Sequence, residues 1–212
     1  MRKTADIIAK ALSVLLYPLF IPTYGMGLFC YAYTTQVSPL TTIWMIVAIL
    51  GTFLLTCIIP LTAIWLMMRR GAVKDLYIDN ASERTMPYLY AALGFGFWSY
   101  LLASILHAPL FISLVAIGAT VAISLVLLIN RWWKISAHLT GLGGLVGGLM
   151  SYCLGIGAYP TIGTWSIWLG LSLVLMYARL YLNAHTSAQV CAGWLLGLFC
   201  TFVPYCIVFY VA

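Results

Sequence analysis

The chain is poor in charged side chains, and above all in acidic ones. Of its 212 residues, four are Asp or Glu and ten are Lys or Arg, so charged residues make up 7 % of the sequence. Hydrophobic residues make up 64 %, and the mean hydropathy is +1.07. No soluble domain needs that much apolar material, so the composition predicts an integral membrane protein. The net charge of +6 then indicates membrane orientation and an anionic ligand rather than a nucleic-acid partner.

The sequence also lacks the common motifs of metal, redox and nucleotide sites. Its four carboxylates do not form an oxygen-ligand cluster, so we expect no metal and no other cofactor. These carboxylates are Asp6, Asp75, Asp79 and Glu83. The six cysteines lie scattered in or beside apolar runs without a Cys-x-x-Cys pair, which indicates small buried side chains. There is no nucleophile elbow, His-Glu-x-x-His motif or P-loop.

Apolar runs of the roughly 20 residues that a membrane-spanning helix needs fill most of the chain. The first run covers about residues 11–33 and contains Pro18 and Pro22, which predict a kink or a broken helix. We expect this run to be retained rather than cleaved as a signal peptide. Six more runs follow. The second, third and fourth cover about residues 41–68, 88–106 and 110–129. The fifth ends near Gly157, and the sixth and seventh cover about 162–182 and 188–211.

These runs predict an all-α, polytopic membrane protein with about seven spans in a single domain, residues 1–212. Seven spans would bring three polar patches, residues 69–86, 130–138 and 182–187, to one side of the membrane. All ten basic residues would lie toward that side, and the positive-inside rule assigns it to the cytoplasm. Gly143-x-x-x-Gly147 and Gly144-x-x-x-Gly148 in the fifth run have the spacing of close helix packing.

The last polar patch carries the strongest sign of a functional site. Arg179 and His185 lie six positions apart at a membrane boundary, where ionisable groups are costly and are usually retained for a function. Gln189 follows His185 by about one helical turn. A second histidine, His138, ends the patch Asn130–His138.

These patches resemble the three motifs of the type 2 phosphatidic acid phosphatase superfamily, which are Lys-x6-Arg-Pro, Pro-Ser-Gly-His and Ser-Arg-x5-His-x3-Asp. The third motif is matched by Arg179, His185 and Gln189, with Gln189 in place of the aspartate. The second is matched by the residues from Ile135 to His138, read as Ile-Ser-Ala-His. The resemblance covers about residues 74–212.

The first motif is matched loosely. Lys74 and Arg84 are ten positions apart rather than seven, and Pro87 follows Arg84 by three positions. Lys134 lies one turn before His138 and could replace the weakly matched Lys74. The alternative roles of these lysines are a solvated or headgroup contact for Lys74 and an interface anchor for Lys134.

The resemblance implies a metal-independent phosphatase that acts on a membrane lipid phosphate through a phosphohistidine. His185 would be the nucleophile and His138 the general acid. Arg179 would bind the phosphate as a bidentate fork, with Ser136, Arg84 and Lys74 or Lys134 as further phosphate ligands. A capping box at the start of the last helix is the alternative role of Gln189, which would otherwise orient His185.

The implied substrate is similar to phosphatidic acid, phosphatidylglycerophosphate or a polyprenyl (pyro)phosphate, and the implied location is the bilayer of a bacterial inner membrane. Bacterial members of the family usually face the periplasm, which is the alternative to the cytoplasmic side that the positive-inside rule favours. The missing aspartate and the loose first motif favour a rival, a catalytically impaired relative that binds or translocates a phospholipid or anion. The retention of both histidines and of Arg179 favours the enzyme.

Overall fold

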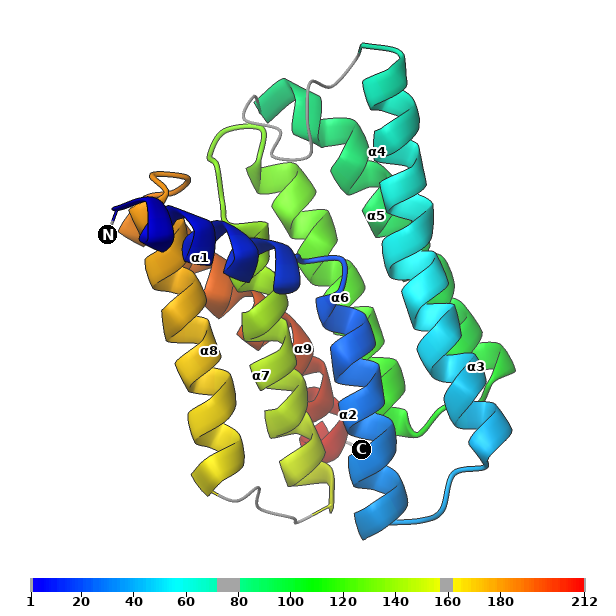
Figure 1. The fold of residues 1–212 in the computed structure, drawn as a ribbon. Helices are drawn as coiled ribbons and strands as arrows, with labels where there is room; N and C mark the ends of the chain where they lie inside the picture. Colours follow the sequence, from blue (N-terminus) through cyan, green and yellow to red (C-terminus); the bar gives the residue numbers. More distant parts are fainter. Residues whose placement is uncertain (1, 72–80, 157–161, 212) are drawn as a thin grey trace.

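The computed structural model describes residues 2–71, 81–156 and 162–211, and this part of the chain is helical apart from short connections (Figure 1). Its helices are α1 (Arg2–Leu15), α2 (Ile21–Gln36), α3 (Thr42–Phe53), the π-helical turn η1 (Leu54–Ile58), α4 (Ile59–Arg69), α5 (Ala81–Tyr100), the π-helical turn η2 (Leu101–Ile105), α6 (Leu110–Ile129), α7 (Ala137–Ile156), α8 (Ile162–Tyr181) and α9 (Ser187–Val211).

Four helical segments of the described chain are long and apolar enough to cross a membrane. They are Thr42–Arg69, Glu83–Ile105, Leu110–Ile129 and Ser187–Ile207. Each corresponds to one of the apolar runs of the sequence. The protein is therefore an all-helical, multi-pass membrane protein, and the all-α prediction is confirmed for the described residues.

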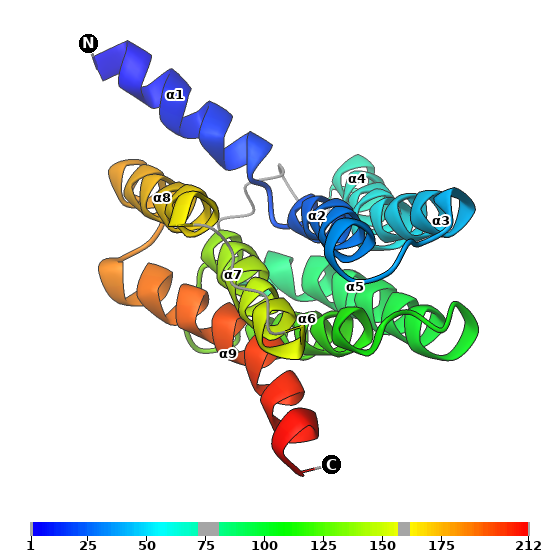
Figure 2. The same ribbon diagram turned by 90° about the horizontal axis from the view of Figure 1, so that it is seen from below.

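The first apolar run forms parts of two helices rather than one continuous helix. The prediction of a break at Pro18 and Pro22 is confirmed, because α1 ends at Leu15 and α2 begins at Ile21 with a proline in its first turn. A proline has no N–H to donate and is tolerated best in the first turn of a helix, which is where Pro22 lies in α2. α1 then lies across one end of the bundle and extends outward past α8 (Figures 1 and 2).

The second run stays helical across Pro60 by changing its hydrogen-bond register. The turn η1 ends at Ile58, two residues before Pro60, and the Ile59 N–H that caps it donates to the Leu54 carbonyl five residues back. A π-helical turn of this kind accommodates the proline ring that would otherwise clash with a carbonyl of the preceding turn. The segment from α3 to α4 therefore remains one continuous rod.

Among the described helices, α7 and α9 share the most extensive contact. The glycine spacing predicted close packing of α7, without indicating which helix it packs against. A Cβ atom on Gly143 would clash with the backbone of Trp194, and one on Gly147 would clash with the backbone of Leu198. Glycine thus allows the two backbones to touch. The same contact continues to the helix starts, where the Ser136 N–H donates to the Gln189 carbonyl at 3.3 Å. The segments that carry the second and third motifs are thereby held side by side.

Candidate phosphate site

Four of the residues expected in the site line one cavity. Arg84, His138, Arg179 and His185 surround a space of about 310 Å³ together with residues of α1 and of the α1–α2 connection. They come from the start of α5, the start of α7, the end of α8 and the α8–α9 connection, which are up to 101 positions apart in the sequence. Tertiary packing therefore brings residues from the three separate polar patches around one cavity.

The two arginines are buried although both are cationic. Arg84 is 6 % exposed and Arg179 is 8 % exposed. The Nη1 of Arg179 donates to the Ser13 Oγ at 3.2 Å, and this hydroxyl in turn donates to the Ala9 carbonyl at 2.9 Å. Guanidinium groups at such depth are costly, so the cavity favours an anion, and a phosphate matches the arginine fork.

His185 is held in one tautomer by the backbone of the neighbouring connection. Its Nδ1 lies 3.2 Å from the Lys134 carbonyl oxygen. Because a carbonyl can only accept, Nδ1 carries the proton and Nε2 keeps its lone pair. Burial, helped by the charge of Arg179, lowers the pKa of His185 from 6.5 to about 4, although the bond to Lys134 acts in the opposite direction. The imidazole is therefore neutral at pH 7, as a nucleophile must be.

His138 contacts the N-terminal segment on two sides. Its Nε2 lies 3.1 Å from the Ser13 carbonyl oxygen and so donates to it. The ring of Tyr17 packs edge-on against the imidazole, with ring centroids 5.6 Å apart. Burial raises the pKa of the Tyr17 hydroxyl to about 12, so Tyr17 is a neutral wall of the cavity.

Ser136 is fully buried at the α7–α9 contact. Its Oγ has no hydrogen-bond partner among the residues that the structure describes, while its carbonyl accepts from the N–H and the hydroxyl of Thr140 at 3.0 Å each. It lies two residues before His138 but is not among the residues that line the cavity. Its phosphate-binding role stays a prediction.

Gln189 forms a capping box with Thr186 at the start of α9, which was the alternative to its role in orienting His185. The Thr186 N–H donates to the Gln189 Oε1 at 3.0 Å, and the Gln189 N–H donates to the Thr186 Oγ1 at 3.4 Å. These two bonds satisfy donors that the start of α9 leaves open. The carbonyl of Lys134, rather than Gln189, holds the Nδ1 of His185.

The remaining expected ligands are placed differently. Lys134 is half-buried and contributes its backbone to the site, whereas Lys74 lies outside the described residues. Within the described ranges, no three His, Cys, Asp or Glu side chains gather closely enough to hold a metal ion. The sequence reasoning missed Ser13, Tyr17 and Tyr88, which also line the cavity. No sequence pattern marks Ser13 or Tyr17, because the fold alone brings α1 to the motifs.

Comparison with known proteins identifies no relative. No protein-family model, no curated protein and no solved structure matches the chain.

Proposed function

We propose that the protein is a membrane-embedded, metal-independent phosphatase that hydrolyses a lipid phosphate through a phosphohistidine on His185. The single observation that carries this proposal is the cavity. Residues assigned to three separate motifs, Arg84, His138 and the pair Arg179 and His185, line the same space of about 310 Å³. Two buried guanidinium groups and two imidazoles are suited to phosphoryl transfer, which depends on positioning and charge stabilisation.

The proposed reaction has two steps. The lone pair on the His185 Nε2 attacks phosphorus, the bond from phosphorus to the lipid oxygen breaks, and protonated His138 gives its proton to that oxygen. A water molecule then attacks the phosphohistidine and loses a proton to His138, which releases inorganic phosphate and regenerates both histidines. Arg179 and Arg84 stabilise the charge on the phosphoryl oxygens in both steps.

The hydrogen bond between His138 and the Ser13 carbonyl adds a requirement to this two-step reaction. The His138 Nε2 now donates to the Ser13 carbonyl, so the lipid oxygen must replace that carbonyl as the acceptor when substrate binds. Burial and the charge of Arg179 lower the pKa of the His138 imidazole from 6.5 to about 3, so His138 is neutral at pH 7 in the free protein. The scheme requires the negative phosphate of the bound substrate to raise this pKa until His138 is protonated.

The membrane topology in this proposal has seven spans, with the site at one interface of a bacterial inner membrane. In its favour, the α6–α7 and α8–α9 connections lie at the same end of the bundle as α1 (Figure 1). The ten basic residues follow the positive-inside rule if this end faces the cytoplasm. The substrate then meets the site at headgroup depth, which suits a phosphatidic acid, phosphatidylglycerophosphate or polyprenyl (pyro)phosphate.

The alternative function is binding or translocation of a phospholipid or anion without hydrolysis. The capping role of Gln189 favours it, since no carboxylate then stabilises the charged His185 after attack. Phosphate release from a panel of lipid phosphates distinguishes the two. We expect release by the wild type and none by His185→Ala, with a folded variant in detergent. Equal release by both proteins would exclude the phosphohistidine.

A further inference from the structure

A second, apolar cavity adjoins the phosphate cavity. It has a volume of about 120 Å³ and lies among α2, α3, α5, α6, α7 and α9. Four residues line both cavities, namely Pro18, Phe95, Ile123 and Ala137. The two spaces are therefore neighbours, with the arginines and histidines confined to one of them.

The apolar cavity is elongated along the bundle. On α6 its lining extends from Val126, near the phosphate site, to Ile112. These residues are fourteen positions apart, which is about 21 Å of helix. A small volume spread over this length has the shape of a chain rather than of a compact ligand.

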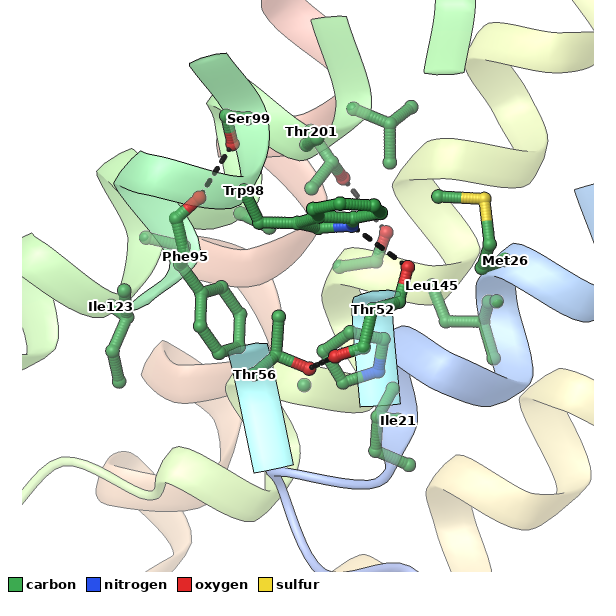
Figure 3. A pocket seen from close by; sticks show the side chains of 18 of the residues that line it. Ile21, Met26, Thr52, Thr56, Phe95, Trp98, Ser99, Ile123, Leu145 and Thr201 are labelled. Atoms are coloured by element: carbon green, nitrogen blue, oxygen red, sulfur yellow. Dashed lines mark hydrogen bonds between the residues drawn. The ribbon is translucent and has the colours of Figure 1, made fainter. Parts of the chain in front are cut away.

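The polar side chains of the apolar cavity are already hydrogen-bonded within the protein. The Trp98 Nε1 donates to the Thr52 Oγ1 at 2.8 Å, and the Thr56 hydroxyl donates to the Thr52 carbonyl at 2.8 Å (Figure 3). The Ser99 hydroxyl donates to the Phe95 carbonyl at 2.9 Å, and the Thr201 hydroxyl donates to the Gly144 carbonyl at 2.9 Å. Such a cavity offers little to water or to a polar ligand and favours hydrocarbon.

We infer that the apolar cavity binds one hydrocarbon chain of the phosphorylated substrate inside the helical bundle. The inference rests on the proposed function, because the neighbouring cavity is taken to hold the phosphate. It narrows the substrate class to lipid phosphates that can insert a single chain between α5, α6 and α7. Ala119 and then Ala116 lie progressively farther from the phosphate site on α6 and limit how deep the chain extends.

The test compares alkyl phosphates with the same head and different chains. Octyl phosphate has six more methylenes than ethyl phosphate, and each methylene fully buried from water adds about a fourfold preference, for a ceiling of about 4,000-fold. With about half of these methylenes buried in the cavity, we expect kcat/KM for octyl phosphate to exceed that for ethyl phosphate by on the order of a hundredfold. Ala119→Phe fills the cavity and should bring this ratio close to one. Ala116→Phe is a second filling variant, about one turn deeper, and should reduce the ratio less. Ile117→Phe, on the adjacent exposed position of the same helix, should keep the wild-type ratio.

An unchanged ratio in folded Ala119→Phe and Ala116→Phe would overturn the inference. Absence of hydrolysis of both phosphates by the wild type would instead contradict the proposed function. In that case an octyl phosphate with a photoreactive diazirine at the chain end still tests the cavity. We expect crosslinks near Trp98 and Ala116, and crosslinks confined to lipid-exposed residues such as Ile117 would contradict chain binding inside the bundle.

Discussion

Gln189 has two candidate roles, capping the start of α9 and orienting His185. Its contacts favour the capping role. Gln189→Ala removes the bond from the Thr186 N–H to the Gln189 Oε1 and keeps the bond from the Gln189 N–H to the Thr186 Oγ1. We therefore expect a loss of about 1 kcal/mol in stability and little change in turnover. Gln189→Glu retains the capping geometry and should be nearly neutral in thermal unfolding. If Gln189 instead orients His185, turnover by Gln189→Ala falls steeply while the melting temperature hardly moves.

His185 determines the acid limb of the pH profile. Its pKa is lowered to about 4, so the imidazole becomes protonated, and loses its lone pair, only as the pH falls through about 4. We therefore expect the acid limb of kcat/KM near pH 4, measured with a short-chain phosphate in detergent. An acid limb near the ordinary histidine value of 6.5 would show that His185 is solvated in the free enzyme.

The pH profile needs a control for acid unfolding between about pH 6.5 and pH 4. The folded-state pKa lies below the unfolded value, so the unfolded chain binds more protons between about pH 6.5 and pH 4, and this group's contribution to stability falls as the pH falls. Activity lost through protonation of His185 alone should return fully at pH 7. Activity that does not return would indicate irreversible unfolding.

Ser13 is a positioning residue for Arg179. Ser13→Ala removes the acceptor of the Arg179 Nη1, and a hydrogen bond of about 1 kcal/mol corresponds to about a fivefold change. We expect KM to rise by about this factor with kcat nearly unchanged, and Ser13→Thr to restore it. Thr4→Ala, on the exposed side of α1, is the matched control. A loss of kcat with unchanged KM would assign Ser13 a different role.

At the scale of elements, the α7–α9 contact holds both histidines in place. Gly143→Ala puts a methyl group against the Trp194 backbone and should cost about 1–3 kcal/mol, with a lower melting temperature in detergent. Gly170→Ala on α8 meets no atom within 4 Å and serves as the control. Equal melting temperatures for the two variants would mean that the helices can separate without cost.

The sequence predicted most elements because long apolar runs and prolines act locally. The break at Pro18 and Pro22 and the glycine contact of α7 both follow from backbone chemistry. The separate course of α1 could not be predicted in the same way. Ala9 and Ser13 of α1, and Leu16 directly after it, are buried by packing against one end of the bundle, which no local pattern specifies.

At the scale of the whole molecule, the candidate site could be predicted only in part. The motif spacing predicted Arg84, His138, Arg179 and His185, and these four share a cavity. The spacing could not predict that a carbonyl of the α6–α7 connection orients His185, because backbone groups leave no mark in a sequence. The apolar cavity was missed for a related reason, since it is formed where side chains from six separate helices meet.

The most direct test of the central claim is to trap and locate the phosphoenzyme. The protein is mixed with a radiolabelled lipid phosphate, quenched with base within one turnover and digested for peptide mapping. We expect an alkali-stable, acid-labile phosphoryl group on His185, and no label in His185→Ala. Turnover with label on another residue, or turnover without a covalent intermediate, would contradict the account.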